Sequence, residues 1–313
     1  MKKIILINIL LIIGIFATSE IISYHKLYDK YRNLYTNLSK MNKNFDLKED
    51  MKYKSTNNLD HILEDKNFNG VRIKYSNKRP ILIFGCSFAN GFNLKPNQTF
   101  SSVLSNLTNR TVYDRTKCST GTSFMYYQLT QDSFKKHVPD AEYIIYVMIY
   151  DHFNRFFKYK FYTFSDQAFP RYEIKNGKLS FIEPRFLMFY NLNTVRLIQE
   201  KIEEKKNDNT KIKDELFEKI MLESVKVTKN KYPNSKFILL VYPECNYEPN
   251  SEKSIRRNIL IKNIEKKGVI VYNAEELVGH SLNKPEYIAQ DGYHPSAKAW
   301  QEITPKLVQK LKI

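Results

Sequence analysis

The chain has 313 residues, of which 42% are hydrophobic and 27% are charged, a composition that excludes a wholly disordered protein and allows one substantial core. The formal net charge is +17, but the lysines are scattered and no nucleic-acid-binding motif is present, so we expect no nucleic-acid partner. A basic surface of this kind instead suits anionic lipid or an anionic wall polymer, and it fits better still a proteome that is simply rich in lysine. Three cysteines without zinc-ligand spacing predict neither a disulfide framework nor a bound metal.

The N-terminus carries a membrane signal. Two lysines precede an apolar run over residues 4–17, and the apolar pattern resumes at Ile21. Two interpretations stay open: a signal peptide cleaved near the small residue Ala17, or an uncleaved transmembrane helix. Because the apolar run resumes, we favour a transmembrane anchor over residues 1–22, in contact with the membrane through residues 4–22. The rest of the chain is then expected outside the cytoplasm, in the periplasm or at the cell surface.

Residues 23–76 are polar, rich in Asn and Lys, and carry few strand signals. Apolar and aromatic residues at helical spacing over 24–35 predict that this segment begins as a helix, and we interpret the whole of it as a helical stalk or linker. The pattern changes near residue 77, where we place the start of the main domain, 77–313.

From Arg79 onward, short apolar runs alternate with helical patterns. The runs are nearly continuous, as is typical of strands buried on both faces of a parallel sheet. Strands that alternate with helices predict a doubly wound α/β fold with right-handed crossovers, whose functional site lies at the carboxyl ends of the strands. The expected strands are 81–84, 112–113, 143–149, 237–242 and 269–272, and the expected helices are 100–107, 123–137, 187–206, 214–232, 252–267 and 296–311.

An insertion over residues 153–185 interrupts this alternation. It is rich in aromatic and basic residues, and residues 171–182 read as a hairpin that turns at Asn176-Gly177. The insertion follows a strand, so we expect it near the site. It is either a substrate platform or a hairpin that packs its own aromatic residues on the domain.

Two short segments carry the chemistry. Ser87 directly follows the first strand of the domain, in Gly85-Cys86-Ser87, and Asp291-Gly292-Tyr293-His294 directly precedes the last helix. A serine hydrolase needs a hydroxyl, a base that takes its proton, and a carboxylate that orients the base. Taken singly, Ser87 also suits a helix N-cap and His294 a structural role, so the pairing of the two segments carries the prediction.

In these two segments the chain resembles the SGNH/GDSL hydrolase family. The resemblance spans about residues 79–311, with Cys86 where the family usually has Asp and a full match at Asp291 and His294. It implies a flavodoxin-like three-layer α/β fold of the SGNH type, with Ser87 as nucleophile, His294 as general base and Asp291 as its orienter. It also implies ester hydrolysis without a cofactor.

The middle segments of the family pattern differ in this chain. Ser119 stands where an oxyanion glycine is expected, although its backbone N–H can still donate, and Gly121 keeps part of the signature. After the strand 143–149 no Asn is in register, and the loss of one oxyanion donor costs roughly 100- to 1,000-fold in turnover. Three interpretations stay open: His152 or Asn154 replaces this donor, the enzyme is slow, or the site has taken another role. The candidate oxyanion donors are therefore Ser87, Ser119, Gly121, His152 and Asn154.

Asp151 and Arg155 form a polar cluster with His152 at the end of the same strand. The cluster is interpreted either as a salt-bridged cap of the strand end or as a direct part of the site.

These observations predict a membrane-anchored serine esterase that acts on an ester, most plausibly an O-acyl group of a cell-envelope glycan, through an acyl-serine intermediate. An O-acyltransferase that uses the same acyl-Ser87 is the second enzyme hypothesis, because a sugar hydroxyl can replace water in the second step. A degenerate SGNH module that binds a glycan or a membrane partner is the non-enzymatic hypothesis.

Overall fold

The computed structural model divides the chain into two compact units. One comprises residues 1–44 with 183–209, and the other comprises residues 45–182 with 210–313 and contains the sheet. In the first unit, residues 14–23 are helical. The structure describes residues 14–23, 25, 62–65, 70–73, 76–118, 120–131, 135, 140–156, 170–182, 198, 201, 210–243 and 250–313.

The predicted membrane anchor and two predicted helices fall largely outside these residues. No helix in the described part of the chain has the length and hydropathy needed to cross a bilayer. Residues 1–13, which hold most of the predicted anchor, lie outside the described ranges, as do most of 24–35 and 187–206.

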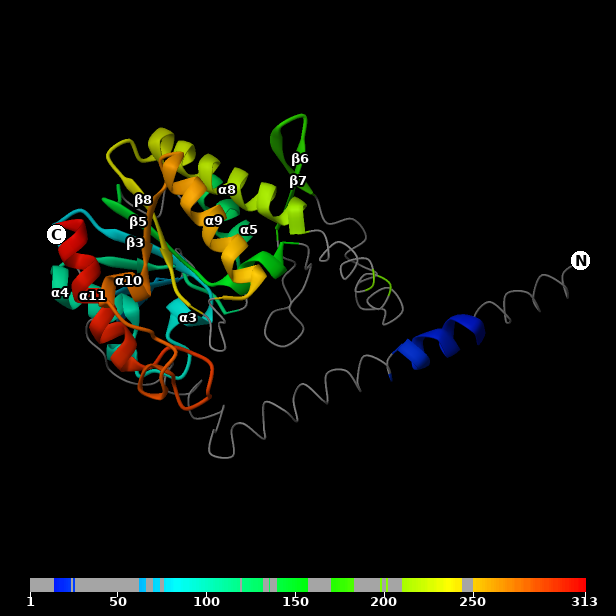
Figure 1. Cartoon of the computed structure of the whole chain (residues 1–313), viewed down its shortest axis with the longest axis horizontal. Coiled ribbons are helices and arrows are strands. Elements are labelled where there is room, and N and C mark those ends of the chain that lie inside the picture. The colour runs from blue at the N-terminus through cyan, green and yellow to red at the C-terminus, as the bar shows by residue number, and fades with distance from the viewer. Residues whose placement is uncertain are drawn as a thin grey trace, which may run out of the picture. The chain divides into compact units, whose positions relative to one another are not determined.

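The second unit is built on a parallel sheet with helices on both faces (Figure 1). Its parallel strands lie in the order β4-β3-β5-β8-β9. In chain order this is 2-1-3-4-5, the flavodoxin-like order, which confirms the expected fold class. The strands are β3 (Ile81–Gly85), β4 (Val112–Asp114), β5 (Tyr143–Met148), β8 (Lys236–Val241) and β9 (Ile270–Asn273).

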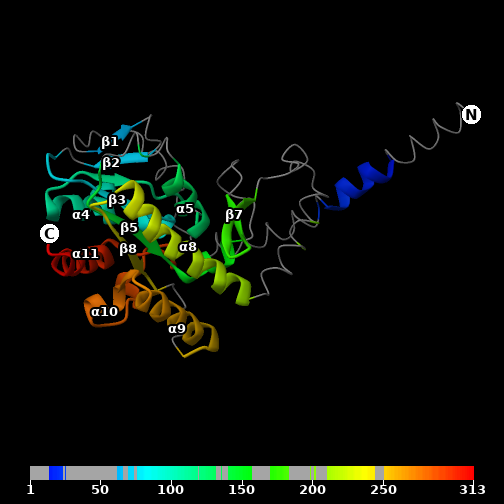
Figure 2. The same cartoon turned by 90° about the horizontal axis from the view of Figure 1, so that it is seen from above.

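Alternate residues of the central strands face two separate cores, which explains why their sequences are continuously apolar. Leu82 of β3, for example, packs in the first core and its neighbour Ile83 in the second. The two helix layers are visible on opposite sides of the sheet in Figures 1 and 2. The first core is covered by α5 (Thr122–Thr130), α8 (Thr210–Lys231) and α9 (Glu252–Lys266), and the second by α4 (Phe100–Thr108) and α11 (Ala297–Leu311).

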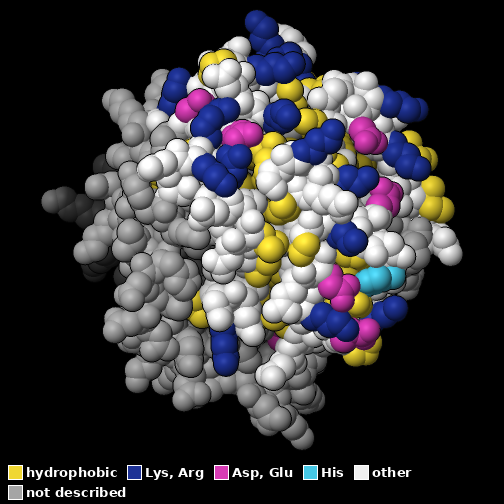
Figure 3. Space-filling view, turned by 90° about the vertical axis from the view of Figure 1, so that its left-hand side faces the viewer, with side chains coloured by type: hydrophobic (Ala, Val, Ile, Leu, Met, Phe, Trp, Pro, Cys, Tyr) yellow, Lys and Arg dark blue, Asp and Glu magenta, His cyan; other side chains and the backbone are white. Residues whose placement is uncertain are grey.

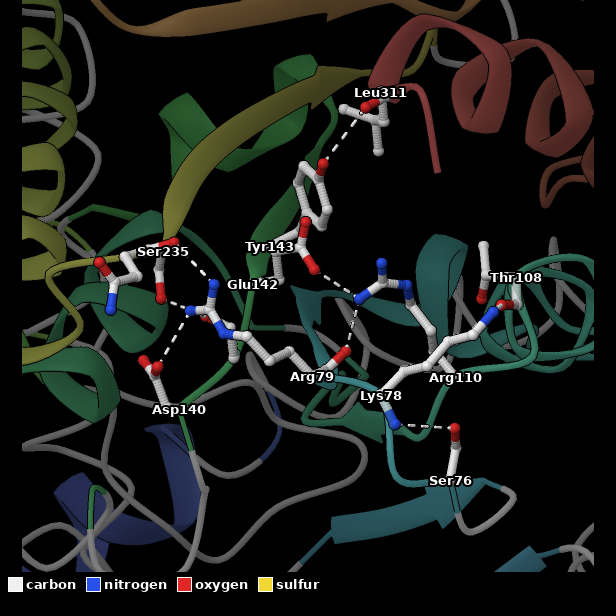
Figure 4. A network of polar contacts seen from close by, with 12 residues as sticks. Ser76, Lys78, Arg79, Thr108, Arg110, Asp140, Glu142, Tyr143, Ser235 and Leu311 are labelled. Carbon is white, nitrogen blue, oxygen red and sulfur yellow. Dashed lines mark hydrogen bonds and ion pairs between the residues drawn. The ribbon is translucent and has the colours of Figure 1, made fainter.

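Two arginines join the amino ends of the strands, opposite the edge where the site is expected. Arg79, just before β3, donates to the backbone oxygens of Asn234 at 3.1 Å and Ala141 at 3.2 Å. Arg110, just before β4, donates to the backbone oxygen of Arg79 at 2.8 Å and to Glu142 at 2.5 Å (Figure 4). These contacts hold together the segments that lead into four neighbouring strands.

The insertion forms the expected hairpin. Strands β6 (Arg171–Lys175) and β7 (Lys178–Ile182) pair antiparallel, and Asn176 and Gly177 have φ angles of 49° and 72°. Positive φ at both central residues is the geometry of a type I′ turn. The ring of Tyr172 packs edge-on against Tyr126 of α5, with centroids 5.1 Å apart. This contact favours the interpretation in which the hairpin packs its aromatic residues on the domain.

The structure corrects the expectation that residues 23–76 are a helical stalk throughout. Strands β1 (Ile62–Asp65) and β2 (Gly70–Ile73) extend the sheet, and β2 pairs antiparallel with β4. Without β2, β4 would leave a row of unpaired backbone groups at the edge of the sheet. Four-residue strands in a polar segment carry too short a pattern to be recognised from the sequence.

Basic side chains are distributed over the surface. On the face drawn in Figure 3, Lys and Arg side chains lie among acidic, uncharged and apolar side chains and are not gathered in one stripe. The net positive charge is therefore spread over this face, as the scattered lysines of the sequence predict.

Candidate active site

Ser87 lies at the carboxyl edge of the sheet, where it is the first residue of the short helix α3 (Ser87–Asn90) that follows β3. A glycine at position 85 is needed for space: a Cβ there would lie 2.6 Å from Cβ of Ala89 and 3.2 Å from the backbone oxygen of Val147. The absence of a side chain lets α3 fold back on the ends of β3 and β5. Ser87 is thus presented on a tight strand-to-helix turn, as expected for a nucleophile.

Asp291 and His294 lie in a loop that enters the same region just before α11. The loop is closed by a bridge between Ile288 and Pro295 and by a 2.7 Å hydrogen bond from the Ala289 N–H to the His294 backbone oxygen. Ser296 then caps α11, its hydroxyl accepting from the backbone N–H of Ala299 at 3.4 Å. The loop therefore holds its two polar side chains on a fixed backbone.

The structure brings Ser87, His294 and Asp291 into one hydrogen-bonded chain. His294 Nε2 lies 2.8 Å from Ser87 Oγ, and His294 Nδ1 lies 2.5 Å from Asp291 Oδ2. The other carboxylate oxygen, Oδ1, accepts from the backbone N–H groups of Tyr293 and His294, both at 3.0 Å. This is the order of groups in a Ser-His-Asp triad, with each pair at hydrogen-bonding distance.

Asp291 is buried, with 8% of its surface exposed. Burial by itself raises the pKa of Asp291, but hydrogen bonds and charge from His294 and the backbone N–H groups outweigh it, so the pKa lies below its ordinary value. Asp291 is therefore a carboxylate at neutral pH, able to orient His294 and to stabilise the imidazolium that forms when His294 takes a proton.

Asn93 is a site residue that the sequence did not reveal. Its side-chain amide donates to Asp291 Oδ2, the same oxygen that binds His294, and its backbone is left-handed with φ of 70°. The sequence offers only a weak signal for it, an Asn shortly after Gly91, since Asn tolerates the left-handed conformation that a turn can require. Asn93 fixes the carboxylate from the side of the nucleophile turn.

Aromatic rings enclose the imidazole. The ring centroids of Phe88 and Phe92 lie 5.1 Å and 5.0 Å from that of His294, and Tyr293 lies edge-on at 5.2 Å. Both phenylalanines belong to the turn that presents Ser87. The packing of this turn on the His294 ring thus helps to hold nucleophile and base together.

The segment that contains Ser119 and Gly121, two of the candidate oxyanion donors, runs along the carboxyl end of β3. The N–H of Lys117 and the hydroxyl of Thr120 both bind the backbone oxygen of Gly85, at 3.0 Å and 3.1 Å. Gly121 follows as the N-cap of α5. Ser119 lies outside the described residues, between two positions that contact this end of the strand.

His152 and Asn154, the other candidate oxyanion donors, lie on the 3₁₀ helix η2 (Tyr150–Arg155), which follows β5. His152 is fully buried, and its Nδ1 is 2.6 Å from the hydroxyl of Tyr146. Burial lowers the pKa of His152 well below its ordinary value, and the charge of Arg155 lowers it further. A neutral, enclosed imidazole bonded to Tyr146 is not placed as a donor to substrate, and this geometry favours a structural role for His152.

Asn154 and Arg155 have different surroundings. The Asn154 amide donates to Asp151 at 3.1 Å, and its oxygen accepts from Lys213 of α8 at 3.4 Å. Arg155 Nε donates to Asp151 at 2.7 Å, and its Nη1 donates to the backbone oxygen of Thr120 at 2.5 Å. Arg155 therefore connects η2 to the segment before α5, a contact the sequence did not predict.

Cys86 and Cys118 are not joined in a disulfide in the structure, and Cys245 lies outside the described residues. Among the residues that the structure describes, no group of His, Cys, Asp or Glu side chains is arranged to hold a metal ion. The chemistry available to the described site is that of a serine hydroxyl, an imidazole, a carboxylate and backbone N–H donors.

In comparisons with known proteins, no protein-family model and no curated protein matches the chain. Solved structures similar to it include a lipolytic protein of the G-D-S-L family from Desulfitobacterium hafniense, at 11% identity and a TM-score of 0.45, with 74% of this chain and 99% of that chain covered. Another is the psychrotrophic esterase EstA from Pseudoalteromonas sp., at 12% identity and a TM-score of 0.44, with 75% and 97% covered. A third is a carbohydrate esterase family 2 enzyme from Corynascus thermopiles, at 12% identity and a TM-score of 0.45, with 76% and 66% covered.

Proposed function

We propose that this protein is a serine esterase of the SGNH type, with Ser87 as nucleophile, His294 as general base and Asp291 as the residue that orients His294. The observation that carries the proposal is the continuous hydrogen-bonded chain from Ser87 Oγ through the His294 ring to Asp291 Oδ2. Three groups of the required types meet at the carboxyl edge of a doubly wound sheet, where the functional sites of such folds lie.

The geometry supports acyl transfer in two steps. Ser87 Oγ attacks the carbonyl carbon of the ester while its proton passes to His294 Nε2, 2.8 Å away. The tetrahedral intermediate collapses as His294 returns this proton to the leaving alkoxide, which departs as an alcohol and leaves acyl-Ser87. A water then gives its proton to His294 and attacks the acyl carbon, and a second collapse frees the acid and Ser87.

Backbone N–H groups are the proposed oxyanion donors. Ser87 is the first residue of α3, so its own N–H belongs to those that a helix leaves without an intrahelical partner. The segment bound to the end of β3 by Lys117 and Thr120, followed by Gly121, supplies the second donor. Donors of this kind stabilise the negative charge that develops on the carbonyl oxygen.

The substrate class and location belong to the same proposal. We place the enzyme outside the cytoplasm, anchored by residues 1–22, and acting on an O-acyl ester of a cell-envelope glycan. Three features of the sequence support this: the lysines and apolar run at the N-terminus, the net charge of +17, and the aromatic insertion 153–185. A basic surface favours approach to an anionic envelope polymer.

A fluorophosphonate probe tests the proposal, because it phosphonylates only a serine activated by its base and oxyanion donors. The full-length protein, in detergent, is incubated with the probe and the modified peptide is identified by mass spectrometry. We expect one phosphonyl group, on Ser87, and no labelling of Ser87→Ala. A wild-type protein that stays unlabelled contradicts the proposal and favours a module that binds without turnover.

The competing acyltransferase is distinguished in the second step. With a small aryl acetate as acyl donor, hydrolysis releases acetate and the aryl alcohol in equal amounts. Addition of an acetyl-free envelope polysaccharide as acceptor diverts acetyl groups to the glycan if acyl-Ser87 prefers a sugar hydroxyl to water. Equal release of both products in the presence of acceptor supports the esterase, and acetylated glycan supports the transferase.

A further inference from the structure

Arg155 connects the parts of the candidate site that the triad itself does not connect. It ends η2 after β5, and its side chain, with only 10% of its surface exposed, reaches the segment before α5. Nε donates to Asp151, four residues earlier, at 2.7 Å, and Nη1 donates to the backbone oxygen of Thr120 at 2.5 Å. One planar guanidinium thus joins a fixed carboxylate to the backbone next to Gly121.

Gly121 leaves room for the Arg155 side chain. A Cβ at position 121 would lie 3.3 Å from Cβ and 3.5 Å from Cδ of Arg155. The backbone of Gly121 is extended, with φ of −151° and ψ of −163°, a conformation open to any residue. The absence of a side chain therefore provides space, and that space is filled by the stem of Arg155.

Arg155 interacts electrostatically with residues that neighbour both members of the catalytic pair. Burial raises the pKa of the Cys86 thiol, and Arg155 opposes this with its charge and a hydrogen bond. Arg155 also interacts electrostatically with Tyr293. Cys86 directly precedes the nucleophile and Tyr293 directly precedes the base, so the guanidinium lies close to both segments.

Arg155 stays protonated in this setting. Burial by itself lowers its pKa, but interactions with Cys86 and Asp151 outweigh burial and raise the pKa above the ordinary value for arginine. The guanidinium is therefore a permanent cation with fixed donors, able to hold the neighbouring backbone in one arrangement throughout a reaction cycle.

Resting on the proposed esterase function, we propose that Arg155 is the positioning residue of the oxyanion side of the site. It fixes the backbone of Thr120–Gly121, a segment that binds the end of β3 just before the nucleophile, in a chain that lacks the Asn expected after the strand 143–149. Arg155 does not touch the substrate, and it acts on the reaction through the Thr120–Gly121 backbone that it holds in place. His152, the first candidate from the sequence, is enclosed against Tyr146 and serves the strand end instead.

The experiment measures the fluorophosphonate labelling rate and steady-state ester turnover for the full-length protein and five variants. Arg155→Gln removes the charge, and its shorter amide cannot bind Asp151 and the Thr120 oxygen together, so we expect labelling and kcat to fall about 100-fold with little change in KM. Arg155→Lys keeps the charge but cannot reach Asp151 and Thr120 together, so it is expected to be nearly as slow. A lysine variant close to the wild-type rate contradicts positioning.

Gly121→Ala tests the contact from its other side. Its Cβ pushes against Arg155, so labelling is expected to slow about 10-fold in the wild-type background. In an Arg155→Gln background the link to the Thr120 backbone is already lost, so displacing the side chain at position 155 has little further effect, and we expect Gly121→Ala to add little. Fully additive effects of the two substitutions overturn the coupling.

Arg110→Gln is the matched control. Arg110 also donates to one backbone oxygen and one carboxylate and is similarly enclosed, with 14% of its side chain exposed, but it lies at the amino edge of the sheet. The Arg110→Gln variant is expected to lower the melting temperature as much as Arg155→Gln does and to keep the wild-type labelling rate per folded molecule.

The outcomes separate this inference from the proposed function. Labelled wild type with an equally reactive Arg155→Gln variant overturns the inference and leaves the esterase intact. Wild type that is not labelled overturns both. If Arg155→Gln does not fold, the rates of Arg155→Lys and Gly121→Ala decide, because each leaves a cation at position 155.

Discussion

His294 Nε2 lies 2.8 Å from Ser87 Oγ although 207 positions separate the two residues. The contact joins a turn after the first parallel strand of the domain to a loop before its last helix, so it forms only when the whole sheet is assembled. Asp291 and Asn93 extend it on the far side of the imidazole. The resulting order of donors and acceptors leads to specific expectations for single substitutions.

Ser87→Ala and His294→Ala are each expected to lower ester turnover at least about 1,000-fold, because one removes the nucleophile and the other its base. The melting temperature should change little in Ser87→Ala, which removes one hydroxyl. It should fall in His294→Ala, which also removes a ring packed against Phe88 and Phe92, so turnover is expressed per folded molecule. Turnover of the aryl acetate and thermal unfolding are measured on the same preparations.

His280→Ala is the matched control for the histidine. His280 also binds a carboxylate, Glu302, at 3.0 Å, and stacks on the ring of Tyr287. Its described hydrogen bonds go to Glu302, the Tyr287 hydroxyl and the backbone oxygen of Ser281, and none of them involves a serine hydroxyl. It should retain wild-type turnover. Equal losses in His280→Ala and His294→Ala would point to a general effect on the fold and argue against the triad.

Asn93→Gly removes the amide that binds Asp291 while keeping a residue that adopts positive φ without strain. We expect kcat to fall about 10-fold with little change in KM, because Asp291 loses a partner that orients its carboxylate. Asn93→Asp places a second carboxylate against Asp291, and this repulsion should move the acid limb of the kcat profile to higher pH. An unchanged profile in the aspartate variant would contradict the contact.

Much of the fold could be predicted because its signals are local. Each central strand is continuously apolar since its alternate residues enter two cores, and the Asn176-Gly177 turn specifies its own geometry. The contacts that were missed depend on tertiary structure. Arg155 binds the backbone oxygen of Thr120, a group that every residue possesses, so no motif marks the pair. Asn93 reaches Asp291 across 198 positions.

Strand pairing at the sheet edge was missed for a related reason. Val71 in β2 pairs with Asp114 in β4, and the partner strand, not the polar sequence around Val71, supplies the hydrogen-bonding groups that make a strand there. His152 shows the reverse case. Its residue type suggested a donor to substrate, but the neighbouring Tyr146 and the depth of burial give it an internal partner.

Arg79→Gln should destabilise the fold without changing turnover. Arg79 donates to backbone oxygens of Asn234 and Ala141 at the amino edge of the sheet, and the loss of such bonds costs about 1–3 kcal/mol in the free energy of unfolding. Its ion pair with Asp140 at 3.0 Å is half-exposed, so Asp140→Asn should cost less than about 1 kcal/mol. Denaturant unfolding checks both values. Equal losses of unfolding free energy in Arg79→Gln and Asp140→Asn would show that the ion pair, and not the backbone contacts, carries the stabilisation.

His152→Phe is expected to change stability and its pH dependence while sparing the rate per folded molecule. The phenyl ring can keep the stacked contact with Tyr146 but loses the 2.6 Å hydrogen bond.

Because burial holds the pKa of His152 well below its ordinary value, the folded protein keeps this imidazole neutral while the unfolded chain protonates it near pH 6.5. The unfolded state then binds the extra proton, so wild-type stability falls as pH drops through this range, by up to about 1.4 kcal/mol per pH unit. His152→Phe lacks this contribution, and the stability difference between the two proteins should shift in favour of the variant between pH 7 and pH 5. Denaturant unfolding across that range, with turnover at pH 7, measures both effects. A 100-fold loss of rate with unchanged stability would instead return His152 to the oxyanion site.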